Sequence, residues 1–415
     1  MWSGMNCNLK SILWMGVILN IFSPKIQGQN VTTFEKLQTF IYQNPEVKTI
    51  YIKNGVYHDV NIALFRLEGI IIQAEEAGKV ILQGKSNINI RNSRNIVLSG
   101  FHFQKTWSQY LIKLEKVSNS VIKECFFDHC EGNAYSRIIG LQGGSTHNKI
   151  LNNTFDGIHT MGITISRDGN YYNTISKNIF LNIPRVKVVH PESKDGNGME
   201  TISIGTVPFW DEDMEKREFN TTVSYNYFEN IEGDMNEIIC VKANKNFIEN
   251  NYFTKNKGGI SLRYGNNNVV NNNIFVENSQ NIIVWGKGHQ ISNNIIYNDE
   301  IGIQLPSSQF KNTRKNIKNN KAGFFQIENI VIKDNVIFTL DGNPFFVGRH
   351  YSKDRELLPT NILIKNNQLK IENKEINQHI SNLRDAKFEN NSTIHIGDNL
   401  EEKIKPNKYY YGKSW

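Results

Sequence analysis

A short strand-like phrase recurs through the middle of the chain at nearly constant spacing. It reads Glu-Ile-Ile-Cys-Val at 237–241, Gly-Ile-Ser-Leu-Arg at 259–263, Asn-Ile-Ile-Val-Trp at 281–285 and Gly-Ile-Gln-Leu-Pro at 302–306. The steps are 22, 22 and 21 residues. A constant period of this length is typical of a solenoid, in which each repeat buries its apolar side only against its neighbours. Residues distant in sequence then form columns, and one column should hold Val241, Arg263, Trp285 and Pro306, with Lys242 at its edge.

Asn-rich turns separate further short strands along most of the chain. Examples are Phe-Ile-Glu-Asn-Asn-Tyr-Phe at 247–253 and Ile-Ser-Asn-Asn-Ile-Ile-Tyr at 291–297, with no long helical pattern between them. This pattern predicts an all-β fold, a right-handed parallel β-helix. We expect the leading Asn of each pair to stack as a ladder inside a turn. We also expect one buried column of isoleucines, namely Ile202, Ile238, Ile260, Ile282 and Ile303.

The N-terminal region contains two features that lie outside the repeat. Lys10, an apolar run from Ile12 to Phe22 and the small Gly28 indicate a signal peptide over residues 1–28, hence a secreted or periplasmic protein. The run is too short to span a membrane comfortably. Apolar residues at helical spacing then predict a short amphipathic helix over 33–42 that caps the open end of the solenoid. Residues 29–415 are therefore interpreted as one β-helix domain.

The outward residues of the repeat include several charged groups. If the second and fourth residues of each phrase point inward, the outward set comprises Arg167, Glu237, Lys242, Arg263 and Trp285, and Cys240 lies in the core. Lys242 and Arg263 are one coil apart, so we expect the arginine to lower the pKa of Lys242 and make it a usable general base. Glu237 and Lys242 have opposite strand parity, so they share a face only if the turn after Val241 reorients Lys242.

Two plainer interpretations of these residues stay open. Exposed Lys and Arg side chains on a solenoid are mostly solvated charge, and an outward Trp can either stack on a sugar ring or cover a neighbouring loop. The formal charge of +7 fits an acidic polymer partner better than a basic one.

Four blocks of sequence together resemble the consecutive motifs of polysaccharide lyase family 6, which contains alginate lyases and chondroitinase B. They are Asn-Gly-Met-Glu-Thr-Ile-Ser-Ile-Gly at 197–205, Asn-Glu-Ile-Ile-Cys-Val-Lys at 236–242, Leu-Arg-Tyr-Gly at 262–265 and the stretch from Val284 to Asn294. The resemblance implies an enzyme that cleaves a uronic-acid polysaccharide by β-elimination. It implies Lys242 as catalytic base and Arg263 as catalytic acid.

The resemblance also implies further site residues and partners. Asn197 and Glu237 match the family's Ca²⁺ ligands, and Glu200 and Asp234 are near enough in sequence to complete a calcium site. Residues expected to bind substrate are Arg167, Tyr264, Trp285, His289 and Arg349. We expect a monomer whose partner is an anionic polysaccharide, with no nucleic-acid binding and no membrane insertion.

Two positions depart from the family's pattern. Tyr264 stands where the family usually has histidine, and Met235 stands where it has a second calcium carboxylate, so the need for Ca²⁺ is left open. The substrate is also open between alginate and a glycosaminoglycan such as dermatan sulfate. A uronate epimerase, a non-catalytic sugar-binding protein and a glycoside hydrolase with paired carboxylates are the alternatives.

Overall fold

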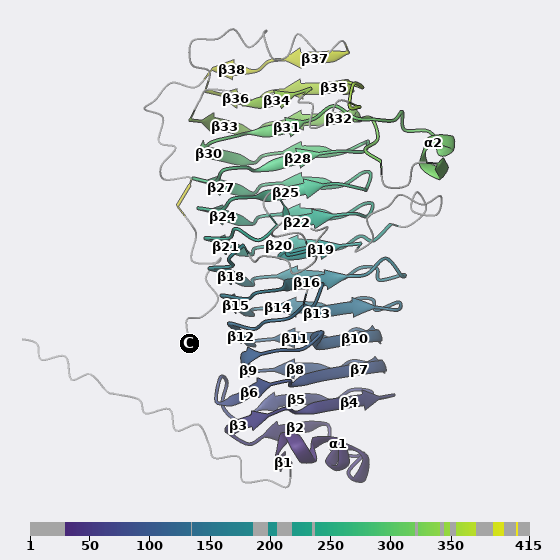
Figure 1. Ribbon diagram of the computed structural model, residues 1–415, viewed down its shortest axis with the longest axis vertical. Coiled ribbons are helices and arrows are strands. Elements are labelled where there is room, and N and C mark those ends of the chain that lie inside the picture. Colours follow the sequence, from purple (N-terminus) through teal and green to yellow (C-terminus); the bar gives the residue numbers. More distant parts are fainter. Residues whose placement is uncertain are drawn as a thin grey trace, which may run out of the picture.

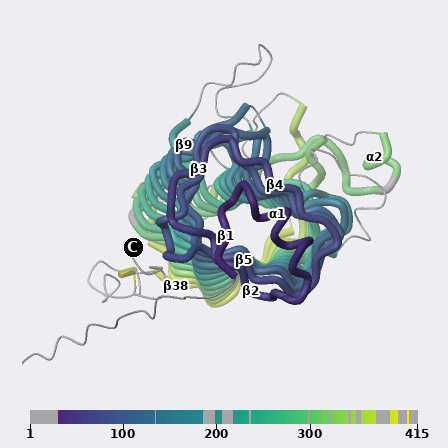
Figure 2. The backbone as a smooth tube through the Cα atoms, turned by 90° about the horizontal axis from the view of Figure 1, so that it is seen from below, coloured from purple at the N-terminus to yellow at the C-terminus, as the bar shows by residue number. Residues whose placement is uncertain are grey.

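The protein is a column of stacked coils built from short parallel strands (Figure 1). The computed structural model describes residues 30–133, 135–185, 198–205, 218–234, 237–319, 323–340, 344–348, 354–370, 385–393 and 404–405. Viewed along the column, the successive coils superimpose (Figure 2). The predicted parallel β-helix is confirmed, whereas the predicted signal peptide lies outside the described residues.

Within the described residues the strands form three sheets, of which an 11-stranded sheet carries the candidate site. Its strands are β4 (Asn61–Phe65), β7 (Asn87–Arg94), β10 (Tyr110–Ser118), β13 (Arg137–Gln142), β16 (Met161–Ile165), β19 (Ile202–Ile204), β22 (Glu237–Val241), β25 (Gly259–Leu262), β28 (Ile282–Val284), β31 (Ile303–Leu305) and β34 (Phe345–Val347). All pairings between them are parallel, so each coil adds one strand to this sheet.

The isoleucine column runs through this sheet with one correction. The register pairs Ile202 with Ile239 and Ile239 with Ile260. Ile260 then pairs with Ile282, and Ile282 with Ile303, so Ile239 and not Ile238 belongs to the column. The pairing of β22 with β25 shifts between Glu237 and Ile239, which makes Ile238 the extra residue of a β-bulge. The simple two-residue alternation assumed from the sequence fails at this bulge.

The other two sheets complete each coil. The 14-stranded sheet contains β1 (Val31–Thr32), β2 (Thr49–Ile52), β5 (Ile71–Ala74), β8 (Val97–Ser99), β11 (Val121–Lys123), β14 (Lys149–Leu151), β17 (Thr174–Ser176), β20 (Thr222–Ser224), β23 (Phe247–Glu249), β26 (Val269–Asn271), β29 (Gln290–Ser292), β32 (Glu328–Lys333), β35 (Thr360–Lys365) and β37 (Ala386–Glu389). The 13-stranded sheet contains β3 (Gly55–His58), β6 (Val80–Gly84), β9 (Phe101–Thr106), β12 (Phe126–Asp128), β15 (Thr154–Asp156), β18 (Ile179–Leu181), β21 (Tyr227–Glu229), β24 (Tyr252–Thr254), β27 (Ile274–Val276), β30 (Ile295–Asp299), β33 (Val336–Thr339), β36 (Gln368–Leu369) and β38 (Ser392–Thr393).

An asparagine ladder lies in the turn between these two sheets. Each buried amide donates from Nδ2 to the Oδ1 of the Asn one coil further on, at 2.9 to 3.0 Å, from Asn153 to Asn391. The ladder uses the second Asn of each pair, not the leading one as expected. The leading residue, for example Asn250 with φ 56°, instead takes the left-handed backbone that closes the turn.

Aromatic and apolar side chains fill the interior beside this ladder. Seven phenylalanines stack on one another with ring centroids 4.6 to 5.2 Å apart, namely Phe103, Phe127, Phe155, Phe180, Phe228, Phe253 and Phe275. Because each coil contributes an equivalent side chain at the same place, the core is continuous along the column.

The predicted capping helix is present as α1 (Phe34–Gln43). Phe34, Leu37 and Ile41 are buried, and Phe34 packs against Phe101 at 5.1 Å between ring centroids. Figures 1 and 2 show α1 across the first coils at the N-terminal end. The helix therefore shields an end that would otherwise expose the core. Within the described part of the chain, no helix is long and apolar enough to cross a membrane.

Candidate active site

Lys242 forms a buried ion pair with Glu200. Its Nζ donates to Glu200 Oε1 at 2.9 Å, and the two residues are 7% and 4% exposed. Lys242 follows the end of β22, whereas Glu200 lies just before the start of β19 in the adjacent coil. The lysine side chain must therefore run back across the outer face of the sheet.

Arg263 makes an equivalent pair with Glu237 one coil further on. Its Nη1 lies 3.0 Å from both carboxylate oxygens of Glu237, and Ser261 Oγ donates to Oε1 at 3.1 Å. Arg263 follows β25 directly after Leu262, which pairs with Val241, so Arg263 is the neighbour of Lys242 as predicted. Lys242, and not Val241, therefore lies beside Arg263 in the outward column, and Val241 points into the core.

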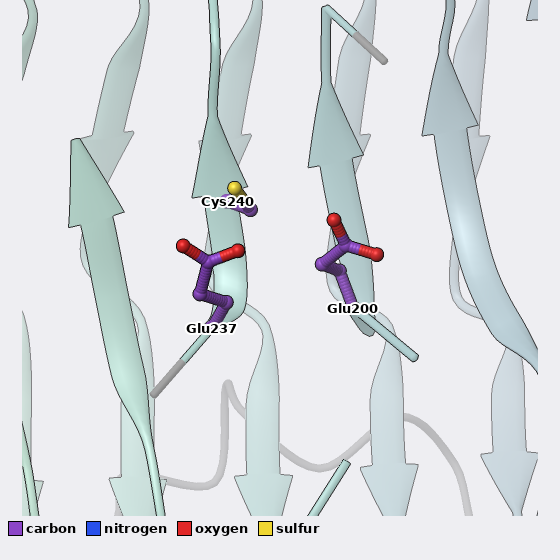
Figure 3. A group of neighbouring side chains, drawn as sticks. All are labelled: Glu200, Glu237 and Cys240. Atoms are coloured by element: carbon purple, nitrogen blue, oxygen red, sulfur yellow. The ribbon is translucent and has the colours of Figure 1, made fainter. Parts of the chain in front are cut away.

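Small side chains lie beneath these two cations. Ser203, Cys240 and Ser261 are in register on β19, β22 and β25, and none is exposed. Cys240 therefore points outward between the core residues Ile239 and Val241, which corrects the expectation that it belongs to the core. Figure 3 shows Cys240 and Glu237 on one strand, with Glu200 on the next. The bulge at Ile238 explains the shift, because it turns Glu237 to the same face as Cys240 and Lys242.

The charge state of Lys242 differs from the sequence-based expectation. Burial disfavours its ammonium form, but Cys240, Glu200 and Glu237 outweigh that effect and raise the pKa of Lys242 above its ordinary value. The prediction that the pKa of Lys242 is lowered is therefore wrong, because the neighbouring carboxylates favour its charged form. In the free protein Lys242 is therefore charged.

Asp234 adds a third carboxyl to the neighbourhood. Burial, together with the negative charges of Glu200 and Glu237, raises the pKa of Asp234 to about 7. Its Oδ2 accepts a hydrogen bond from the backbone N–H of Gly198 at 3.1 Å. Near neutral pH this carboxyl exists in both protonation states.

Several buried polar atoms around the pairs have no hydrogen-bond partner among the described residues. They are Glu200 Oε2, Ser203 Oγ, Arg263 Nε and Trp285 Nε1. Buried polar groups are nearly always paired in folded proteins, so four unpaired ones in adjacent coils indicate a place where a polar ligand binds.

The described side chains fit a calcium ion poorly. Glu200, Glu237 and Cys240 bring one ligand atom each within 4.8 Å of one another. However, Ca²⁺ takes six to eight oxygen ligands, whereas here one ligand is a thiol and both carboxylates already bind a cation. Asn197 and Met235 lie outside the described residues.

Two predicted substrate-binding aromatics are covered by a long connection between β31 and β32. This connection, described over 306–319 and 323–327, contains the short helix α2 (Arg314–Asn319), which projects from the column in Figure 1. Tyr264 is 2% exposed and packs with Ile317 and Phe325, and Trp285 is 6% exposed with its ring 4.9 Å from that of Phe324. The Trp285 ring therefore packs against this connection, and little of its surface is exposed for stacking on a sugar.

The remaining predicted residues have different surroundings. His289 is fully buried and accepts from Asn268 N at Nδ1 while Nε2 contacts Trp285 O at 2.8 Å, and burial lowers the pKa of its ring to about 4. It shapes a turn and does not reach the outer face. Arg167 is partly exposed beside Asp168, at 3.7 Å. Arg349 lies outside the described residues.

Two residues of the site were not predicted from the sequence. Ser261 binds Glu237, and its position as the third residue of its phrase was a usable signal. Phe324 lies 5.9 Å from the guanidinium of Arg263 and 3.7 Å from that of Arg355. Its signal was the break in the period, since the coil after Ile303 is about twice the usual length.

Comparison with known proteins identifies the family of the chain. The model of the chondroitinase B family matches residues 31–407, and the chain therefore belongs to the chondroitinase B family and is a polysaccharide lyase. The predicted resemblance to polysaccharide lyase family 6 is thereby confirmed. No match was found among curated protein sequences.

Solved structures of family 6 lyases share the fold. A mannuronic acid specific lyase from human gut microbiota is 19% identical, with a TM-score of 0.68 over 89% of this chain and 83% of the other. The lyase Pedsa3628 from Pseudopedobacter saltans is also 19% identical at a TM-score of 0.68, over 91% and 95%. The alginate lyase AlyGC is 20% identical, with a TM-score of 0.68. The match covers 88% of this chain and 51% of AlyGC.

Proposed function

We propose that this lyase cleaves a uronic-acid-containing anionic polysaccharide by β-elimination at the outer face of β19, β22 and β25. The observation that carries the proposal is the stack of two ion pairs, Lys242–Glu200 and Arg263–Glu237, in consecutive coils. They place two cations side by side on a face that also holds unpaired polar atoms. Such a site can hold a uronate carboxylate and stabilise the negative charge that develops on it.

Lys242 is assigned as the base that removes the C5 proton. The electron pair of the C5–H bond forms the C4–C5 double bond, and the bond from C4 to the glycosidic oxygen breaks. The amine must be neutral to accept this proton, so Lys242 first has to release its own. Glu200 Oε1, at 2.9 Å, is the group in contact that favours the charged form. The reaction should therefore accelerate as the pH rises.

Arg263 is assigned to the departing oxygen. Its Nη1 is held by Glu237, while its buried Nε–H has no partner among the described residues. A guanidinium fixed at one edge can donate a hydrogen bond from the other without changing its position. It would stabilise the departing oxygen, which becomes a hydroxyl when it takes a proton from solvent water.

The substrate and location extend the proposal further. Alginate and a glycosaminoglycan such as dermatan sulfate are the two candidate polymers, and both the positive net charge and the buried cations favour an anionic chain. The positive charge of Lys10 and the apolar run from Ile12 to Phe22 favour export, so we infer that the enzyme acts outside the cytoplasm.

One assay tests the proposed reaction. The purified protein is incubated with polymannuronate, polyguluronate, dermatan sulfate and a neutral glucan, and the ultraviolet absorbance of the unsaturated uronate is followed. We expect new absorbance with at least one uronate polymer and none with the glucan. Correct folding with no absorbance from any of the three would instead support a sugar-binding protein.

A further inference from the structure

The row of the sheet that contains Glu200 continues towards the N-terminal coils. Gly162 N donates to Glu200 O at 3.3 Å, which places Met161 beside Glu200, and the register then pairs Met161 with Arg137 and Arg137 with Tyr110. With coils about 4.8 Å apart, Arg137 is about 10 Å along the column from Glu200. A polymer bound at the ion pairs and running along the column would pass over it.

Arg137 is a partly exposed cation that has no acidic partner among the described residues. Its guanidinium lies 5.1 Å from the ring centroid of Tyr110, and Nη1 donates to the carbonyl oxygen of Tyr135. No carboxylate of the described residues lies within ion-pair distance of it, whereas Arg91 and Lys113 on the neighbouring coils both pair with Glu115 at 2.8 Å. Arg137 is thus oriented by an aromatic ring and a carbonyl, and its charge is not neutralised.

Tyr135 brings an aromatic ring between Arg137 and the candidate active site. It is 49% exposed, and its backbone has φ 64°, which is uncommon for a bulky residue. Its ring lies against Gly198, where an added Cβ would be 2.7 Å from Cε1, and Gly198 N binds Asp234. The ring of Tyr135 therefore lies beside a residue that contacts Asp234 of the candidate active site.

Glycine also makes room for the second ring. A Cβ at Gly140 would lie 2.5 Å from Cε1 of Tyr110, so the ring can lie across the sheet only because position 140 has no side chain. Tyr110 and Arg137 are therefore fixed on the same row of the sheet as Glu200, and Tyr135 lies two residues before Arg137.

We propose that Tyr135, Arg137 and Tyr110 form a distal subsite that binds an anionic sugar unit of the polymer, two to three coils from the ion pairs. Arg137 takes the carboxylate or sulfate ester of that unit through charge-assisted hydrogen bonds, and the exposed face of Tyr135 contacts its ring. This inference rests on the proposed function, since it names how the same polymer extends from the reactive unit.

Chain length separates this subsite from the reactive centre. Arg137→Ala and Tyr135→Ala are assayed on uronate oligosaccharides of increasing length from the polymer that the wild-type enzyme cleaves. Loss of a charge-assisted contact should raise KM for the longest substrates about tenfold with kcat unchanged, while the shortest cleaved substrate is unaffected. A change of equal size for short and long substrates, or none for long ones, would overturn the subsite.

Two matched variants control for general effects of the substitutions. Arg91→Ala removes a cation of the same sheet that is paired with Glu115, and Tyr172→Ala removes a tyrosine with φ 57° and 53% exposure whose ring stacks on His147. Both should leave KM within about twofold for every substrate length. An Arg91→Ala effect as large as that of Arg137→Ala would reduce the proposed subsite to bulk surface charge.

The subsite can also be tested if no polymer is cleaved. Calorimetric titration of the intact protein with alginate and dermatan sulfate oligosaccharides then replaces KM. Arg137→Ala should weaken binding of the longer chains about tenfold and leave the unfolding temperature unchanged. Unaltered binding would refute the subsite, independently of whether the proposed lyase reaction takes place.

Discussion

Buried polar groups form all their hydrogen bonds in the asparagine turn but only some of them at the outer face of the 11-stranded sheet. In the turn, Asn251 donates to Val223 O at 2.9 Å and Asn273 Oδ1 at 3.0 Å, and it accepts from the backbone and the amide of Asn226. At the outer face, Glu200 and Arg263 each keep an atom without a partner among the described residues.

This contrast shows how one coil divides its tasks. A repeated amide that satisfies every donor and acceptor stabilises the column without leaving capacity for a ligand. Charged groups that are only partly satisfied cost stability but remain ready to bind and react. Substitutions in the turn should therefore change stability alone, whereas those at the ion pairs of the outer face should change activity as well.

The largest effect is expected at Lys242. Lys242→Met should lower kcat by about 10² to 10⁴, the usual contribution of a general base, as measured by unsaturated product formation. It should also destabilise the fold, by about 3 to 5 kcal/mol, because Glu200 would be left as an unpaired buried charge.

The double variant Lys242→Met/Glu200→Gln separates these two effects. It should recover most of the lost stability in thermal unfolding, since it removes the unpaired charge, but none of the activity. Near wild-type rates in either variant would eliminate Lys242 as the base.

In the ladder, Asn251→Ala should cost about 2 to 4 kcal/mol of unfolding free energy, because it leaves buried partners unsatisfied in two neighbouring coils. Denaturant titration measures this, and kcat of the folded fraction should stay unchanged. The exposed Asn61→Ala serves as the control and should shift stability by less than about 0.5 kcal/mol. Equal losses in the two variants would contradict the role given to the ladder.

The pH dependence of kcat/KM probes the Lys242–Glu200 pair. Because the folded protein holds Lys242 in its charged form, the wild-type rate should rise with pH through the alkaline range without reaching a plateau. Glu200→Gln removes a carboxylate that raises the pKa of Lys242, so its profile should level off at lower pH, with about tenfold more neutral amine at a given pH. Superimposable profiles would show that Glu200 does not control the proton of Lys242.

A smaller effect is expected at the end of another, shorter row of stacked asparagines in the turn that follows the 13-stranded sheet. Asn256 and Asn278 continue into Asp299, which is fully buried and whose Oδ2 has no partner among the described residues. Burial raises the pKa of Asp299 well above its ordinary value. Its contribution to stability is thus complete below the unfolded-state pKa of about 3.9 and is lost as pH rises towards the folded-state pKa.

Asp299→Asn would restore an amide and remove this dependence. Relative to the wild type, the free energy of unfolding of the variant should increase by about 1 kcal/mol as pH increases from 4 to 8. Thermal unfolding at several pH values measures this difference. A constant difference across that range would mean that Asp299 does not titrate between the two states.

The smallest effect is expected from removal of calcium. Since Lys242 and Arg263 already bind the two buried carboxylates, extensive treatment with a chelator should change kcat/KM by less than about twofold. Loss of activity that added Ca²⁺ restores would show that an ion displaces at least one of the cations.

The sequence predicted the fold well because a solenoid repeats its signals. The period alone placed Lys242 next to Arg263 and identified the isoleucine column except at Ile238. The predictions were wrong where the outcome depends on the backbone conformation of one coil, as at the bulge and within the Asn pairs. Which Asn of each pair is buried depends on backbone dihedrals, and a two-residue periodicity does not reveal it.

The surroundings of the site residues were less predictable. Nothing in the sequence spacing indicated that Lys242 reaches Glu200, because this contact requires the side chain to cross the strands of two coils. The burial of Trp285 likewise depends on the connection after β31, which belongs to no repeat. Conformations of long side chains and insertions are set by tertiary packing, so periodicity carries no information about them.

The bulge at Ile238 has a consequence for how such a fold acquires chemistry. Side chains along a strand point alternately to its two faces. One extra residue moves every side chain on its N-terminal side to the opposite face and leaves those after it unchanged. Removing Ile238 would return Glu237 to the interior and separate it from Arg263, without altering Cys240 or Lys242. The presence of one residue, Ile238, therefore decides whether Glu237 lies in the core or binds Arg263 at the candidate active site.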